Sequence, residues 1–143
     1  MKKKLSNNKG FSLVELIIVI AIMAVLIGVL APQYLKYVEK SKISSDSDLV
    51  ASIRSGVETM ISDPDYDITA GTINITDSGI TVTGFAAVKS GTTTSVVNDV
   101  MGANWTNQKF KSKKYKALTS GVTITVTIDS DGIPQCTDDA PLN

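Results

Sequence analysis

The sequence of 143 residues contains no histidine and a single cysteine, Cys136. Without histidine it lacks the Ser–His and Cys–His nucleophile pairs and the commonest protein ligand of zinc. One cysteine cannot form a disulfide within the chain, which excludes a disulfide-stapled scaffold. No nucleophile–base set or cluster of metal ligands appears in the sequence. We therefore expect a protein that is not an enzyme and needs neither a cofactor nor a metal.

Acidic residues are absent from the first ten positions, which carry Lys2, Lys3, Lys4 and Lys9. The formal charge of the whole chain is zero, so residues 11–143 hold 10 basic and 14 acidic groups, a net charge of −4. A short basic segment before an apolar run stays on the cytoplasmic side of a membrane. The asymmetry indicates targeting and says little about nucleic acid, because the body of the chain is mildly acidic.

Polar residues are also absent from Leu16 to Ala31. As a helix, residues 11–31 would be about 31 Å long, which matches the hydrocarbon core of a bilayer. The run is longer than the core of a secretory signal peptide, and no A-x-A site follows it before Pro32. An ordinary membrane anchor is an alternative, but it does not explain Glu15, a carboxylate that is costly in hydrocarbon without a partner.

After Pro32 the apolar residues recur at steps of three and four, which predicts an amphipathic helix. They are Tyr34, Leu35, Val38, Ile43, Leu49, Val50, Ile53, Val57, Met60 and Ile61, with Asp46, Asp48 and other charged residues between them. We expect one helix of about 50 residues, kinked or loosened near Gly28 and Pro32 and ended by Asp63-Pro64-Asp65.

The remaining sequence alternates apolar with polar residues, as half-buried strands do. Thr72–Thr76 and Ile80–Thr83 flank a turn signal and predict a hairpin. Gly121–Asp129 is the clearest strand, with Phe110–Leu118 as its expected antiparallel partner, and Thr94–Met101 is expected to be a short helix. The apolar strand positions are Ile73, Ile75, Ile80, Val82, Val122, Ile124, Val126 and Ile128. The predicted fold class is α+β, a long N-terminal α-helix packed on a C-terminal antiparallel β-sheet.

The segment Lys9-Gly10-Phe11-Ser12-Leu13-Val14-Glu15, with the basic leader, the apolar run and Pro32, resembles the class III signal of type IV prepilins. The resemblance covers residues 1–35 closely and the rest only in architecture. It implies a leader at 1–10, a transmembrane or filament-core helix at 11–32, the amphipathic half of the helix at 33–62, and a globular antiparallel β-sheet head at 63–143.

The resemblance also implies how the chain is processed and assembled. A prepilin peptidase would cut between Gly10 and Phe11 and methylate the new amine of Phe11. Glu15 would then offset the positive terminus of a neighbouring subunit, with Pro32 also in the assembly segment. A buried carboxylate and a buried ammonium are each costly alone but tolerable as a pair. Further implied partners are other copies of the chain, other pilins, the pilus assembly platform with its ATPase, and the cytoplasmic membrane.

Two features depart from the familiar Gram-negative pilins. Those close a C-terminal loop with a disulfide, whereas this chain has only Cys136, and its leader is short and rich in lysine. Both features resemble the type IV pilins of Gram-positive bacteria, in which strands secure the C-terminal region.

A lysine cluster lies close in sequence to Trp105, Phe110 and Tyr115, and consists of Lys109, Lys111, Lys113, Lys114 and Lys116. One interpretation is a surface for DNA or another polyanion. The favoured alternative is the solvated face of an edge strand. The acidic residues Asp129, Asp131, Asp138 and Asp139 suit turns better than calcium, because no full calcium-loop pattern is present.

The leading hypothesis is a structural subunit of an extracellular type IV pilus that supports adhesion, twitching motility or biofilm formation. A minor pilin, or a pseudopilin of a type II secretion or DNA-uptake system, is the alternative, because such proteins share the same N-terminal signal. A membrane-anchored binding module that never polymerises is a third hypothesis, and it assigns no role to Glu15. The subunit would sit in the cytoplasmic membrane with its N-terminus inside before assembly, and on the cell surface afterwards.

Overall fold

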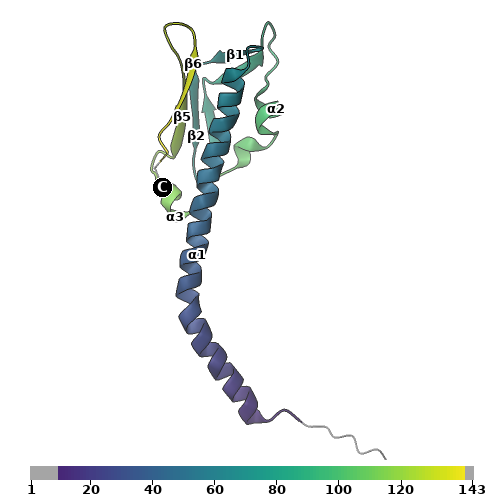
Figure 1. Cartoon of the computed structure of the whole chain (residues 1–143), viewed down its shortest axis with the longest axis vertical. Coiled ribbons are helices and arrows are strands. Elements are labelled where there is room, and N and C mark those ends of the chain that lie inside the picture. The colour runs from purple at the N-terminus through teal and green to yellow at the C-terminus, as the bar shows by residue number, and fades with distance from the viewer. Residues whose placement is uncertain (1–9, 141–143) are drawn as a thin grey trace, which may run out of the picture. The chain divides into compact units, whose positions relative to one another are not determined.

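The computed structural model of the chain describes residues 10–140 and divides into two compact units, residues 1–38 and 39–143. The first unit consists, where described, of a short extended segment and the first part of helix α1, Leu13–Ser62. The second unit holds the rest of α1 and all of the strands (Figure 1). The predicted α+β fold is confirmed.

Helix α1 begins and ends where its sequence signals lie. Ser12 precedes its first residue, and Ser62 ends it directly before Asp63-Pro64. The Asp63 carboxylate accepts a hydrogen bond from the Asp65 N–H at 2.9 Å, which stabilises the turn after the helix. Pro32 lies inside the helix, and the helix continues without interruption past this proline. A proline removes only one backbone donor, so a long helix can pass through it.

Two antiparallel sheets follow α1. The larger sheet contains β2 (Gly71–Ile75), β3 (Ile80–Thr83), β5 (Val122–Ile128) and β6 (Pro134–Asp138), in the order β3-β2-β5-β6. The smaller sheet pairs β1 (Tyr66–Thr69) with β4 (Ala86–Lys89). Between β4 and β5 lie α2 (Val97–Met101), the 3-10 turn η1 (Trp105–Asn107) and α3 (Lys113–Lys116).

One predicted hairpin is confirmed and the other is wrong. Strands β2 and β3 pair as expected, with Ile75 opposite Ile80. The predicted strand Phe110–Leu118 instead contains α3, because the hydroxyl of Ser112 accepts the Tyr115 N–H and caps the start of that helix. The predicted strand Gly121–Asp129 is confirmed as β5, but its neighbours are β2 and β6.

The core of the second unit lies between α1 and the larger sheet (Figure 1). Alternate residues of β2 and β5 supply its sheet side, namely Ile73, Ile75, Val122, Ile124 and Val126. The helix side comes from the predicted stripe and consists of Leu49, Val50, Ile53, Val57 and Met60. Two expected core positions on the strands are wrong: Val82 is 39% exposed on the edge strand β3, and Ile128 is 44% exposed beyond the start of β2. On the helix, Tyr34 and Leu35 of the predicted stripe are also exposed.

Gly71 shows why the chain needs a glycine where β2 begins. A Cβ on Gly71 would lie 1.9 Å from the backbone nitrogen of Phe85 and 2.4 Å from the carbonyl carbon of Gly84. No heavy atom can approach another so closely, and backbone atoms cannot move aside as a flexible side chain can. The close approach therefore requires a residue without a side chain.

Candidate functional site

The first turn of α1 contains a hydrogen bond between Glu15 and Ser12. The Ser12 N–H donates to Oε2 of Glu15 at 2.9 Å, and the Leu16 N–H donates to the Ser12 carbonyl. Ser12 is the residue before the helix and Glu15 is its third residue, so the pair has the spacing of a capping box. Glu15 was expected to find its partner only in an assembled state, but it already has one within its own chain.

Gly10 and Phe11 precede the helix and are exposed. The Phe11 side chain is 79% exposed, and a Cβ on Gly10 would meet no heavy atom within 4 Å. The peptide bond between them is therefore open to an approaching protein. The remaining leader residues, including Lys2, Lys3, Lys4 and Lys9, lie outside the described residues.

From Leu13 to Leu30 the first part of α1 presents apolar side chains around its circumference. The large ones are 40–73% exposed, with Val19 the least and Leu13 the most exposed. The helix is long and apolar enough to cross a membrane by its length and composition. Pro32 is also exposed, at the end of this apolar stretch. An apolar surface of this extent needs a covering partner, either lipid or protein.

The five lysines of the 109–116 segment are all exposed, but not on a strand. Lys113, Lys114 and Lys116 belong to α3, and Lys109 and Lys111 lie in the segment before it. The strand face proposed for them is therefore wrong. Their solvated character is confirmed, and among residues 10–140 none of the five forms an ion pair.

The aromatic residues near these lysines are core residues. Trp105 is 5% exposed, and Phe110 and Tyr115 are 1% exposed each. The rings of Phe110 and Tyr115 pack against each other with centroids 4.8 Å apart. Base stacking needs an open aromatic face. A nucleic-acid surface that stacks bases on these three rings is therefore wrong.

Two carboxylates of α1 hold the lysine-bearing segment, and the sequence analysis assigned neither of them a role. Asp46 is 1% exposed and accepts hydrogen bonds from the N–H groups of Lys111 and Ser112 and from the Ser112 hydroxyl, at 2.6–3.0 Å. Glu39 accepts the Lys113 N–H. Asp46 was placed among the polar positions between apolar residues. The available signal was its spacing, since Glu39 and Asp46 are seven residues apart and lie on one helix face.

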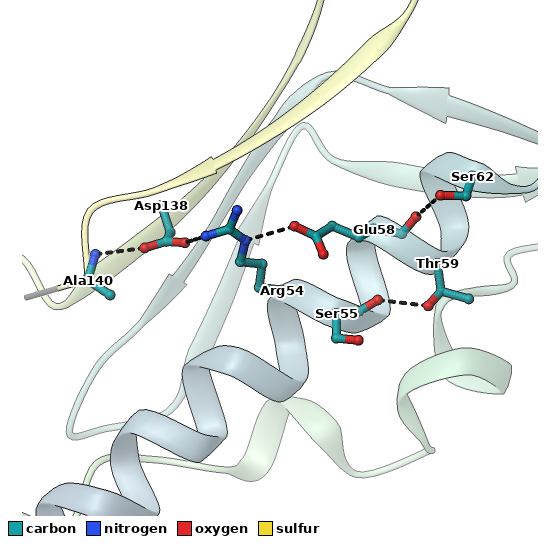
Figure 2. A network of polar contacts seen from close by, with 7 residues as sticks. All are labelled: Arg54, Ser55, Glu58, Thr59, Ser62, Asp138 and Ala140. Atoms are coloured by element: carbon teal, nitrogen blue, oxygen red, sulfur yellow. Dashed lines mark hydrogen bonds and ion pairs between the residues drawn. The ribbon is translucent and has the colours of Figure 1, made fainter. Parts of the chain in front are cut away.

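Arg54 joins α1 to the edge strand β6. Its guanidinium donates to Glu58 at 2.8 Å and to Asp138 at 2.5 Å, as Figure 2 shows. The hydrogen bond to Glu58 raises the pKa of Arg54, and the charge of Asp138 raises it further. Asp138, the last residue of β6, also accepts the Ala140 N–H. Its carboxylate therefore contacts both α1 and the segment after β6.

The other acidic residues near the C-terminus stabilise turns and strand ends. Asp129 accepts the N–H groups of Asp131 and Ile133 within the β5–β6 turn, and Asp139 accepts the Thr123 N–H. Within residues 10–140 no group of three histidine, cysteine, aspartate or glutamate side chains is placed to hold a metal ion. Turn chemistry is the role that the structure gives Asp129, as expected.

Cys136 lies on β6, half-buried, opposite Val126 of β5. Burial raises the pKa of its thiol, the nearby charge of Glu58 raises it further, and Arg54 opposes both. A thiol with a raised pKa is mostly protonated at neutral pH and is a weak nucleophile.

Comparison with known proteins places the N-terminal segment in a family. Residues 5–31 match the prokaryotic N-terminal methylation motif. The chain is 38% identical over 58 residues to the type IV major fimbrial protein FimA of Dichelobacter nodosus, a match that covers 41% of this chain and 37% of that protein. The chain thus spans little more than a third of the length of this relative.

Other relatives align over different shares of the chain. Fimbrial protein Q of Moraxella bovis is 29% identical over 139 residues, covering 93% of this chain and 87% of that protein. Prepilin peptidase-dependent protein A of Clostridium perfringens is 32% identical over 75 residues, covering 52% and 54%. No solved structure gives a significant match. The expected likeness to Gram-positive pilins stays a prediction. In its N-terminal segment the chain is similar to type IV pilins.

Proposed function

We propose that the chain is the precursor of a structural subunit of an extracellular type IV pilus. The observation that carries this proposal is a methylation motif over residues 5–31 that contains an apolar helix segment exposed from Leu13 to Leu30. Such a helix is stable in lipid, and it is stable in a bundle where copies of the same helix cover one another. The fimbrial relatives support the second of these end states.

The exposed N-terminal segment suits the expected processing. A prepilin peptidase would cut after Gly10 and methylate the amine of Phe11, which removes the four leader lysines. The subunit would then leave the cytoplasmic membrane through the assembly platform, driven by its ATPase, and reach the cell surface. Adhesion, twitching motility and biofilm formation are the roles that this location supports.

Glu15 can serve its own helix and a neighbour at the same time. Its Oε2 accepts the Ser12 N–H, while a carboxylate has about four lone-pair sites on two oxygens. The remaining sites can accept the Phe11 ammonium group of an adjacent subunit. Glu15 and Phe11 lie only four residues apart, so parallel neighbouring helices that are close in register can form this pairing.

Filaments sheared from cells that express the chain test the proposal by mass spectrometry. We expect the chain as an abundant component whose first peptide begins at methylated Phe11. A chain that stays in the membrane fraction and is absent from sheared filaments would contradict it. Trace abundance beside another main subunit would instead indicate the minor pilin or pseudopilin alternative.

A further inference from the structure

Basic residues collect at one end of the second unit. Seven of the nine basic residues within 39–143 are Lys40, Lys42, Lys109, Lys111, Lys113, Lys114 and Lys116. Two contacts place the 109–116 segment beside the first turns of this part of α1, because Glu39 and Asp46 accept its backbone N–H groups. The same segment lies at the end of β2, where the Phe110 N–H donates to the Thr76 carbonyl. We call these seven residues the lysine end.

Acidic residues collect at the opposite end of the same unit, where α1 stops. They are Asp63, Asp65, Asp67, Asp129 and Asp131, which we call the acidic end. The first three lie within five residues after Ser62, the last residue of α1. The other two lie in the β5–β6 turn, which extends past the start of β2 because Gly71 is opposite Val126 (Figure 1). Lys89, opposite Tyr66, is the basic residue described at this end.

The two ends cannot neutralise each other within one subunit. Along α1, Glu39 and Ser62 are separated by about 35 Å, at 1.5 Å per residue. Charges this far apart are screened at physiological salt, where the Debye length is about 8 Å. Five carboxylates also lie near the lysine end, and the seven lysines outnumber them. These carboxylates are Glu39, Asp46, Asp48, Asp77 and Asp139.

From this polarity we propose that the lysine end of one subunit binds the acidic end of a second copy of the chain. The inference rests on the proposed function, because parallel subunits displaced along a filament bring unlike ends together. Such a contact is heterologous and repeats along a filament instead of closing a dimer. The buried Trp105, Phe110 and Tyr115 favour a protein partner over a nucleic acid, since none of these three rings is open for stacking.

A zero-length carbodiimide crosslinker tests this contact in wild-type filaments of the full chain. It joins a lysine to a carboxylate only when the two are in contact. A crosslink between the lysine end and the acidic end must join two subunits, because along α1 the ends of one subunit are at least about 24 Å apart, the span from Asp46, which binds the Lys111 N–H, to Ser62. We expect such crosslinks, such as Lys114 to Asp131, and their loss at high salt. Crosslinks from these lysines only to other carboxylates would overturn the proposal.

Charge reversal gives a second test with a rescue. One variant carries Lys113→Glu, Lys114→Glu and Lys116→Glu, and another carries Asp65→Lys and Asp131→Lys. We expect each to lower the yield of sheared filaments roughly fivefold, and the combined variant to recover most of it. Asp99→Lys is the control, because α2 lies between the two ends, beside Gly56. Wild-type yields from both reversals, or no recovery in the combination, would overturn the proposal.

Two outcomes distinguish a failure of this inference from a failure of the proposed function. If neither the wild type nor Asp99→Lys forms filaments, the proposed function fails, and crosslinking of the full chain in membranes then decides whether the two ends meet. Binding of a duplex DNA probe tests nucleic acid as the alternative partner of the lysine end. DNA bound by wild-type filaments but not by the lysine reversal variant, with equal filament yields, assigns the lysine end to nucleic acid and overturns the contact between copies.

Discussion

Asp46 and Ser112 are 66 positions apart in the sequence and are joined by two hydrogen bonds to one carboxylate oxygen. Oδ2 of Asp46 accepts the Ser112 N–H at 2.7 Å and the Ser112 hydroxyl at 2.6 Å. The same hydroxyl accepts the Tyr115 N–H and so caps α3. The buried Asp46 side chain of α1 thus holds the loop segment before α3 and also orients Ser112, the residue that caps α3.

Glu39 extends this arrangement by two helical turns. With Asp46 it accepts three consecutive backbone N–H groups, those of Lys111, Ser112 and Lys113. Backbone donors that are bonded in this way need no strand partner. The lysine side chains of this segment are exposed to solvent.

The second unit is expected to fold without the membrane segment. Every residue of its hydrophobic core, and each partly buried residue packed against that core, lies at position 43 or later. A fragment that begins at residue 36 therefore keeps all of these contacts. We expect a soluble monomer with mixed helix and strand signals in circular dichroism and a cooperative unfolding transition. An aggregated or unfolded fragment would show that the sheet needs the first part of α1.

Asp46→Ala should strongly destabilise this fragment. The substitution leaves the buried N–H and hydroxyl of Ser112 and the partly buried N–H of Lys111 without their acceptor. This loss costs about 2–4 kcal/mol. Asp46→Asn keeps one acceptor oxygen and should lose less. Urea unfolding monitored by circular dichroism measures both, and Asp48→Ala, an exposed position on the same helix, is the matched control. Equal stability of Asp46→Ala and Asp48→Ala would show that these hydrogen bonds contribute nothing net.

Cys136 should react slowly with iodoacetamide, and its pH profile should identify the cause. Burial raises the pKa of the thiol, so less thiolate is present at pH 8 than in the unfolded chain. The midpoint of the rate profile should lie at higher pH in the folded protein than in urea. Because the folded state binds this proton more tightly, stability should fall as the pH rises from the pKa of the unfolded thiol through the higher pKa of the folded thiol. Slow reaction with an unshifted midpoint would indicate steric protection alone.

The sequence predicted the features that depend on local pattern. Apolar periodicity located α1, the Asp-Pro pair located its end, and strict alternation located β5 and the β2–β3 hairpin. The processing motif around Gly10 and Glu15 is local in the same sense, since a few neighbouring residues contain it. These signals need no knowledge of what lies across the core.

The features that sequence reasoning missed depend on distant partners. Phe110–Leu118 was expected to be a strand, but Asp46 supplies an acceptor for its backbone that no local pattern reveals. Strand β6 has few apolar residues and forms because β5 offers an open edge and Arg54 binds Asp138. The Ser12–Glu15 bond was local and had a recognisable spacing, but the carboxylate was considered only as an intermolecular partner.

Gly10→Val should block processing. The residue before the expected cut has no side chain, and a branched one would crowd the peptide bond that the peptidase must approach. Full-length precursor should accumulate in the membrane and sheared filaments should be lost, as an immunoblot of both fractions would show. Lys9→Gln, a neighbouring change that leaves the cut residues intact, is the control. Mature protein of normal size from Gly10→Val would disprove the assignment of the cut.

Glu15 can now be tested for charge separately from helix capping. Glu15→Gln keeps a side-chain oxygen that can accept the Ser12 N–H, whereas Glu15→Leu removes both the acceptor and the charge. Both variants should insert and be cut after Gly10, because the residues at the cut are unchanged. If assembly needs a counter-charge for the Phe11 ammonium group, both variants should lose filaments, since a buried ammonium without a partner is costly. If the cap alone matters, Glu15→Gln should assemble and Glu15→Leu should not. The measurement is an immunoblot for processing beside the quantity of sheared filaments, with each variant as the only copy expressed. Wild-type amounts of filament from Glu15→Gln would rule out the charge pair as the basis of assembly.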